Sequence, residues 1–93
     1  MLAYLNTYRI YSKGLAKIKA RLKYKMITAE EAQSQAQAAA LNLKDVIPSF
    51  EFVYPDYLVE KLEKIIDDYQ NFIDLQEDKM KSAEDEICRE EHI

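Results

Sequence analysis

The chain has 93 residues, a length that supports one domain. Its formal net charge is −4, and its 48% hydrophobic content is too high for intrinsic disorder. Its one glycine, Gly14, excludes Walker-type and dinucleotide-binding loops, and with them most nucleotide-dependent enzymes. Its one cysteine, Cys88, excludes an internal disulfide and a four-cysteine zinc cluster. A lone thiol, without a signal-peptide pattern or an apolar run of membrane length, predicts a cytoplasmic protein.

The first predicted element is a helix over residues 2–25. Apolar side chains recur there at steps of four and three residues, which is typical of one continuous helical face. The stripe comprises Tyr4, Tyr8, Tyr11, Leu15, Ile18 and Leu22, followed by Met26. Gly14 lies inside this helix at a cost of about 1 kcal/mol relative to alanine, which a helix of this length can absorb.

A second helix is predicted over residues 29–45, after a turn at about residues 26–28. Thr28 and Glu31 have the spacing of a capping box, in which the threonine accepts a hydrogen bond from the helix N-terminus and the glutamate reaches back. The expected inner face consists of small residues and one leucine, namely Ala32, Ala36, Ala39 and Leu43. The short connection makes the first two helices antiparallel neighbours.

The hydrophobic period changes over residues 46–55, which we predict to be an extended link bounded by prolines. Residues that precede proline avoid the α region, and Phe50, Phe52 and Tyr54 alternate at period two. We expect Phe50 and Phe52 to be buried against the end of the hairpin. For Tyr54 the sequence favours neither burial nor exposure. If the three side chains are exposed instead, they form an aromatic contact loop, because aromatic residues are favoured in interface hot spots.

The third predicted helix runs from residue 56 to about residue 90, since no glycine or proline follows Pro55. Its apolar residues again recur at steps of four and three, at Leu58, Leu62, Ile65, Tyr69 and Phe72. At 1.5 Å per residue this helix is about 54 Å long, whereas the first helix is about 36 Å long. A folded monomer of this size cannot cover the excess, so the last turns are either solvated or met by a second chain.

Residues 1–93 are therefore expected to form a single all-α domain. It would consist of an antiparallel helical hairpin, an extended proline-bounded link and one long C-terminal helix, in an arrangement that is three-helix bundle-like and partly coiled-coil.

Charge is strongly segregated along the chain. Residues 1–25 carry seven bases and no acid (+7), residues 26–55 carry four acids and one base (−3), and residues 56–93 carry thirteen acids and five bases (−8), which sum to −4. In the first helix, cations recur every four residues and form a basic ridge of Arg9, Lys13, Lys17, Arg21 and Lys25. The four like-charge pairs of this ridge cost about 1–2 kcal/mol. An anion is therefore expected beside the ridge: the acidic third helix of the same chain, that of another copy, or a nucleic acid.

No sequence pattern points to catalysis, and neither an enzyme, a cofactor, a metal nor a small-molecule substrate is predicted. Cys88 and His92 are four residues apart and could contact one metal ion together with Glu84 or Glu91. Two such ligands on a terminal turn, with no second cysteine or histidine in the chain, favour a stray thiol and a solvated imidazole instead. Adjacent carboxylates diverge by about 100° on a helix and cannot share a proton.

The sequence favours a protein–protein interaction module that associates with itself, as a homodimer or higher oligomer, and acts as a small accessory, structural or inhibitory protein. The long helix would supply the seam, because its spacing suits helix-on-helix packing, through Leu62, Ile65, Tyr69, Phe72, Ile73 and Met80. The alternative is a nucleic-acid-binding protein that contacts phosphates through the basic ridge. Against it, a helix-turn-helix would begin its recognition helix with Glu30 and Glu31, which phosphates repel.

Overall fold

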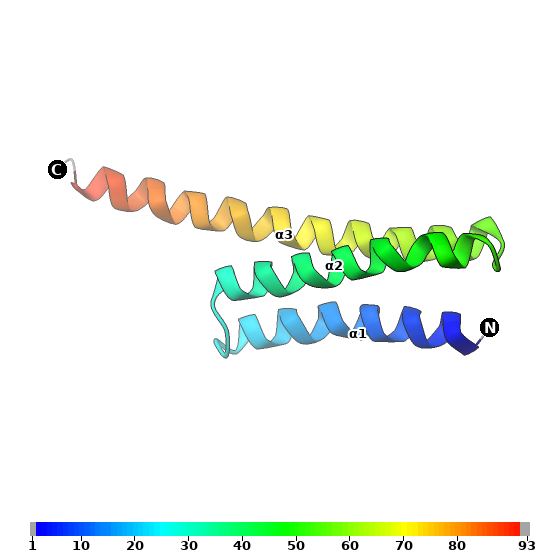
Figure 1. Ribbon diagram of the computed structural model, residues 1–93. Helices are drawn as coiled ribbons and strands as arrows, with labels where there is room; N and C mark the ends of the chain where they lie inside the picture. The colour runs from blue at the N-terminus through cyan, green and yellow to red at the C-terminus, as the bar shows by residue number, and fades with distance from the viewer. Residues whose placement is uncertain (1, 92–93) are drawn as a thin grey trace.

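The chain folds into three helices, α1 (Leu2–Lys23), α2 (Ala29–Glu51) and α3 (Asp56–Glu91). The computed structural model describes the backbone of residues 2–91 and the side chains of residues 2–81, and within this range no strand is present. Consecutive helices run antiparallel, so α1 and α3 run in the same direction (Figure 1). The prediction of an all-α, three-helix bundle-like fold is confirmed.

The capping box predicted for the start of α2 is present. The backbone N–H of Glu31 donates to the Thr28 hydroxyl at 3.1 Å. The Glu31 carboxylate also reaches back, although it accepts from the Thr28 hydroxyl at 3.3 Å and not from the backbone N–H of that residue. Thr28 therefore sets the first residue of α2 by satisfying an N–H group that has no partner within the helix.

The turn from α1 to α2 is closed by a residue in the left-handed conformation. Lys25 has a φ of 59°, and its N–H donates to the Leu22 carbonyl at 3.1 Å while the N–H of Met26 donates to the Arg21 carbonyl at 2.8 Å. This pair of hydrogen bonds is the Schellman motif, in which glycine is the usual residue at the left-handed position. A lysine at that position carries a conformational cost.

The predicted extended link over residues 46–55 is wrong, because α2 continues through Pro48 and ends at Glu51. Proline inside a helix costs about 3 kcal/mol. Ile47, which precedes the proline, is buried, and Phe50, two residues after the proline, is half-buried. Burial of each such side chain stabilises by about 1.5–3 kcal/mol, so packing on the core outweighs the local preference of the residue before proline for an extended backbone.

The aromatic residues expected to share one environment differ from one another. Phe52 is 93% exposed, so its predicted burial is wrong. Phe50 and Tyr54 are half-buried, with their ring centroids 5.3 Å apart. Tyr4 of α1 packs on both, with centroid distances of 6.4 Å to Phe50 and 5.5 Å to Tyr54. A helical step of four residues, and not alternation at period two, therefore decides which rings close this end of the bundle.

The core lies mainly between α2 and α3. Small side chains on α2 let α3 approach closely; the buried residues of α2 include Ala32, Ala36, Ala40 and Leu43. Ala40 occupies the buried position that the sequence pattern assigned to Ala39, which is half-buried. From α3, Leu62 and Tyr69 are fully buried. The α2–α3 interface thus pairs small residues on one helix with large residues on the other.

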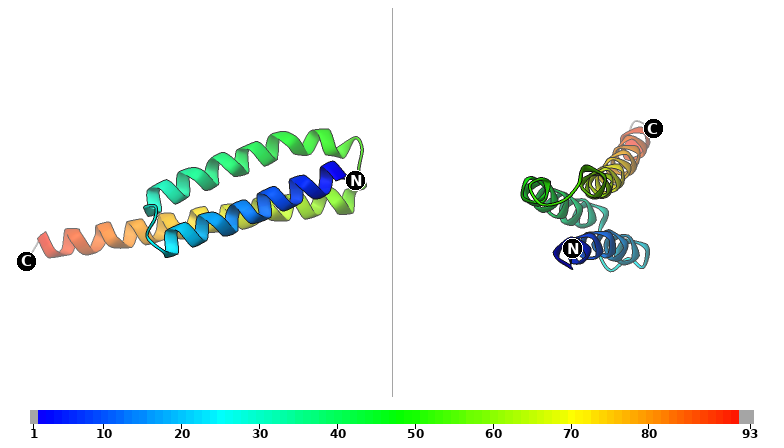
Figure 2. Two further views of the ribbon diagram at one scale, coloured as in Figure 1. Left: turned by 90° about the horizontal axis from the view of Figure 1, so that it is seen from below. Right: turned by 90° about the vertical axis from the view of Figure 1, so that its right-hand side faces the viewer.

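Helix α3 is longer than the helices on which it packs. It has 36 residues, against 22 in α1 and 23 in α2. The molecule measures 60 × 22 × 16 Å and has a radius of gyration of 16.6 Å, whereas a compact domain of this length would have about 12 Å. Figures 1 and 2 show the C-terminal part of α3 running past the α1–α2 turn without folding back. We call residues 80–91 the α3 extension.

Candidate functional site, a groove between α1 and α3

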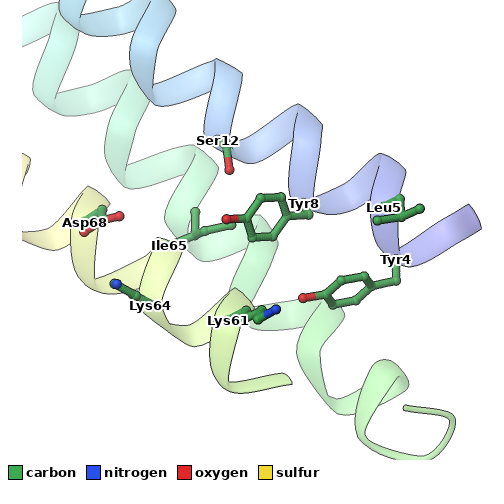
Figure 3. A pocket seen from close by; sticks show the side chains of 8 residues that line it. All are labelled: Tyr4, Leu5, Tyr8, Ser12, Lys61, Lys64, Ile65 and Asp68. Carbon is green, nitrogen blue, oxygen red and sulfur yellow. The ribbon is translucent and has the colours of Figure 1, made fainter. Parts of the chain in front are cut away.

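A hollow of about 550 Å³ lies between the N-terminal halves of α1 and α3. It is lined by Tyr4, Leu5, Tyr8 and Ser12 from α1, and by Lys61, Lys64, Ile65 and Asp68 from α3. Figure 3 shows the two tyrosines reaching from α1 toward α3, where the two lysines lie. One side of the hollow is therefore mostly aromatic and aliphatic, and the other is charged.

Two further hollows of about 430 Å³ each continue along the same two helices. The nearer one shares Asp68 with the first hollow, and the two share Phe72 and Leu75 with each other. Together they form one continuous depression, which we call the α1–α3 groove. Along α3 it runs from Lys61 to Lys79.

The groove exists because α1 packs on α2 more extensively than on α3. Two long side chains bridge α1 and α3 instead: the Tyr4 hydroxyl donates to the Leu58 carbonyl at 2.9 Å, and the Tyr69 hydroxyl donates to the Tyr11 carbonyl at 2.6 Å. Both tyrosines are buried, and burial raises the pKa of each hydroxyl. These bridges fix the position of α1 relative to α3 while leaving the groove open to one side.

The floor of the groove is apolar and partly exposed. Leu5 and Leu75 are each 50% exposed and Tyr8 is 40% exposed, while Ile65 and Phe72 beneath them are buried. Tyr8 belongs to the stripe that the sequence assigned to the helical core face, and it is exposed because α3 does not cover it. Exposed apolar side chains gathered along one groove are typical of interaction sites.

Lysines dominate the rims of the groove. The lining of the groove contains one carboxylate, that of Asp68, and five lysines, namely Lys19, Lys23, Lys61, Lys64 and Lys79. All five are exposed. Among the side chains of residues 2–81 there is one ion pair, between Lys81 Nζ and Glu77 Oε1 at 3.8 Å. The rims therefore carry a formal charge of +4 that no carboxylate of these residues neutralises by direct contact.

The predicted self-association seam lies mostly inside the bundle. Five of its six residues are at most 6% exposed within the single chain, namely Leu62, Ile65, Tyr69, Phe72 and Ile73. The sixth, Met80, is half-buried at the start of the α3 extension. While the bundle is intact, the five buried side chains are not free to pack on a second chain. Any surface that α3 offers to a partner must instead use its groove-facing residues or its extension.

The basic ridge is exposed along its whole length: Arg9, Lys13, Lys17, Arg21 and Lys25. None of the five forms an ion pair with a carboxylate of residues 2–81. Within this part of the chain, pairing of the ridge with the acidic third helix is therefore not observed.

The remaining predicted positions do not converge on a site. Phe52 projects into solvent beside Val53, which is 72% exposed, while Phe50 and Tyr54 pack on Tyr4. Cys88 and His92 lie outside the described side chains. Among the residues that the structure describes, no three histidine, cysteine, aspartate or glutamate side chains are grouped to hold a metal ion. No helix in that range combines the length and the apolar character that crossing a membrane requires.

Sequence reasoning missed the lysines of the groove. The net charge of −8 over residues 56–93 conceals that Lys61, Lys64 and Lys79 share one face of α3. Their spacing in the sequence predicts that they share a helix face. It does not predict that this face borders a groove, because that depends on α1 running beside α3. Comparison with protein-family models, with curated proteins and with solved structures found no match to this chain.

Proposed function

We propose that this chain is a non-enzymatic protein–protein interaction module whose α1–α3 groove binds an amphipathic helix with an acidic polar face. The observation that carries the proposal is a groove with an apolar floor, including exposed Tyr8 and Leu75, between rims that hold five lysines and one aspartate. A helix laid in such a groove buries its apolar stripe on the floor and brings its polar side chains to the rims.

The dimensions of the groove favour a helix over a small molecule. Its α3 wall spans 19 residues from Lys61 to Lys79, and the 18 steps between them measure about 27 Å at 1.5 Å per residue. Small-molecule sites are enclosed cavities that bury most of their ligand, whereas this groove is long and open on one side. Five turns of helix match its length.

The charge of the groove selects the kind of helix. A formal charge of +4 on the rims repels a basic partner and attracts an acidic one, and such complementarity contributes mainly to specificity and to the association rate. The floor supplies the apolar contact that charge alone does not. An acidic amphipathic helix satisfies both requirements.

A designed peptide tests the proposal without knowledge of the natural partner. The isotope-labelled chain is titrated with an 18-residue amphipathic helix that carries leucines on one face and glutamates on the other. We expect NMR shift changes at Tyr8, Lys64 and Leu75, and none at Leu41, which is 60% exposed on α2. A matched peptide with lysines in place of glutamates should not bind.

Two charge reversals locate the binding surface. Lys61→Glu/Lys64→Glu should weaken binding of the glutamate peptide at least about tenfold, because like charges then face each other. Lys13→Glu/Lys17→Glu, which makes the same charge change on the basic ridge, should weaken it far less. Equal effects of the two variants, or shift changes that do not map to the groove, would contradict the proposal.

The wider role that fits this proposal is that of a small accessory, structural or inhibitory protein in the cytoplasm. A single cysteine is ordinary in a reducing compartment. A chain with one histidine and one cysteine, four residues apart near its end, offers few groups for catalysis.

A second candidate function is nucleic-acid binding through the basic ridge. It is supported by the exposure of all five ridge cations and by their lack of ion pairs with residues 2–81. Binding of random duplex or single-stranded oligonucleotides should then weaken steeply as salt rises, because each phosphate contact releases counterions. Lys13→Glu/Lys17→Glu should abolish it. No binding at about 50 mM salt would remove this candidate.

A further inference from the structure

We infer that the helix received by the α1–α3 groove is the α3 extension of a second copy of this chain, docked antiparallel to α3 and exchanged reciprocally between the two copies. This inference rests on the proposed function of the groove and names its occupant. Three observations carry it: the charges of the two elements, their lengths, and their positions along the same helix.

The charge of the extension is opposite to that of the groove. Residues 80–91 contain five acids and two bases, a formal charge of −3. The groove rims contain five lysines and one aspartate, a formal charge of +4. The five groove lysines make no ion pair with residues 2–81, so they are available to an acidic helix. The two elements are therefore opposite in charge.

The lengths of the two elements also agree. The α3 extension has 12 residues, from 80 to 91, and is therefore about 18 Å long. The groove spans about 27 Å between Lys61 and Lys79. The whole extension fits within it, and α1, whose 22 residues end at Lys23 beside the end of the groove, supplies the second wall.

The position of the extension makes the exchange reciprocal. The groove ends at Lys79 and the extension begins at Met80, on the same straight helix. If two copies of α3 lie side by side and antiparallel, with a two-fold axis near Leu75, residues 80–91 of each copy lie opposite residues 59–70 of the other. Each extension then lies along the part of the partner's groove that Tyr8, Lys61 and Lys64 line. Both complementary pairs form at once and the assembly closes as a dimer, as isologous interfaces do. A parallel arrangement would place each extension beyond the partner's groove.

This geometry covers apolar surface that the monomer leaves open. Leu75 and Tyr8 in the groove are 50% and 40% exposed. The extension contributes Met80, Ala83 and Ile87 at helical steps of three and four. This interface differs from the self-association seam predicted from the sequence. Leu62, Tyr69 and Ile73 of that seam remain in the core of each chain, and the groove and the extension form the interface instead.

A charge-swap experiment on the full-length chain tests the inference. Sedimentation equilibrium under reducing conditions, which prevent cross-linking through Cys88, should give twice the monomer mass of 10.9 kDa for the natural chain. The groove variant Lys61→Glu/Lys64→Glu and the extension variant Glu86→Lys/Glu90→Lys should each be monomeric, with dimer affinity reduced about a hundredfold or more. An equimolar mixture of the two variants should dimerise again, because the glutamates introduced in one groove then face the lysines introduced in the partner's extension.

Controls separate a failure of folding from a failure of docking. Circular dichroism should give both variants the helix content of the natural chain, and recovery of the dimer in the mixture shows directly that both fold. Lys13→Glu/Lys17→Glu on the basic ridge has the charge change of the groove variant and should remain dimeric.

The inference and the proposed function fail in different ways. A natural chain that stays monomeric at hundreds of micromolar, but whose groove still binds the designed glutamate helix, overturns the inference and leaves the proposed function standing. A dimer that survives both charge reversals, or a mixture that fails to restore dimerisation, also overturns the inference. A groove that binds neither the designed helix nor the extension contradicts both.

Discussion

A Cβ at position 14 would lie 2.8 Å from the hydroxyl oxygen of Tyr69, so the absence of a side chain at Gly14 is what allows α1 to pass over this residue of α3. Tyr69 is fully buried, and its hydroxyl is held by the Tyr11 carbonyl at 2.6 Å. The ring therefore has little room to move aside. Glycine in the interior of α1 is explained by this close approach, although alanine has the higher helix propensity by about 1 kcal/mol.

Replacement of this glycine should lower stability. Gly14→Ala gains about 1 kcal/mol of helix propensity but displaces Tyr69 from its hydrogen bond and overpacks the α1–α3 contact. We expect a net loss of about 1–2 kcal/mol in the free energy of unfolding, measured by urea denaturation. In a Tyr69→Phe background the clashing oxygen is gone, and Gly14→Ala should stabilise by about 1 kcal/mol. If Gly14→Ala changes the free energy of unfolding by the same amount in both backgrounds, the contact has no energetic consequence.

The left-handed residue in the α1–α2 turn offers a stabilising substitution. Lys25 has a φ of 59° and is the non-glycine residue with positive φ among those described. The left-handed conformation costs a residue with a Cβ about 1–2 kcal/mol. Lys25→Gly should therefore raise the free energy of unfolding by about 1 kcal/mol, after allowance for the greater freedom of glycine in the unfolded chain. Lys25→Ala is the matched control and should not stabilise, since alanine keeps the Cβ. Equal effects of glycine and alanine would contradict this explanation.

Proline within α2 is a second local cost that the fold tolerates. Pro48 is exposed and lies in the last turn of the helix. Pro48→Ala restores a backbone N–H and removes a steric clash, which together should stabilise by about 1–2 kcal/mol. Thermal unfolding measures the change. Pro55→Ala, directly before α3, should give no such gain, because proline suits the start of a helix. A loss of stability in Pro48→Ala would show that the proline is required for the packing of Ile47 and Phe50.

The buried tyrosines predict a loss of stability in alkaline solution. Burial raises the pKa of Tyr4 and Tyr69 above the ordinary value of 10.0. Above pH 10 the unfolded chain releases these protons before the folded chain does. The contribution of these two tyrosines to the free energy of unfolding is therefore fully present well below pH 10 and is lost as the pH rises above it, by at most about 1.4 kcal/mol per pH unit for each tyrosine. Denaturation curves between pH 8 and 12 should show this decline, and Tyr4→Phe should make it shallower. An unchanged slope in Tyr4→Phe would contradict the assignment.

Much of the fold follows from consecutive residues alone. Steps of three and four between apolar residues predict all three helices, Thr28 and Glu31 mark the start of α2, and the absence of breakers after Pro55 predicts the full length of α3. Each of these signals is local: a cap or a helical stripe has the same effect whatever it later packs against. The segregation of charge is likewise a property of the sequence, including the acidic end of α3 that a basic groove would attract.

Three features were decided only by tertiary structure. Burial of Ile47 and Phe50 carries α2 through Pro48, and the same register turns Phe52 into solvent. Packing of α3 on α2 hides the apolar residues that its sequence offers to a second chain. The parallel placement of α1 and α3, bridged by Tyr69 and the Tyr11 carbonyl 58 residues away, creates a groove whose lysines are separate in sequence. The physical reason is common to all three. Contacts between distant residues contribute energies as large as local preferences, and no window of consecutive residues contains both partners.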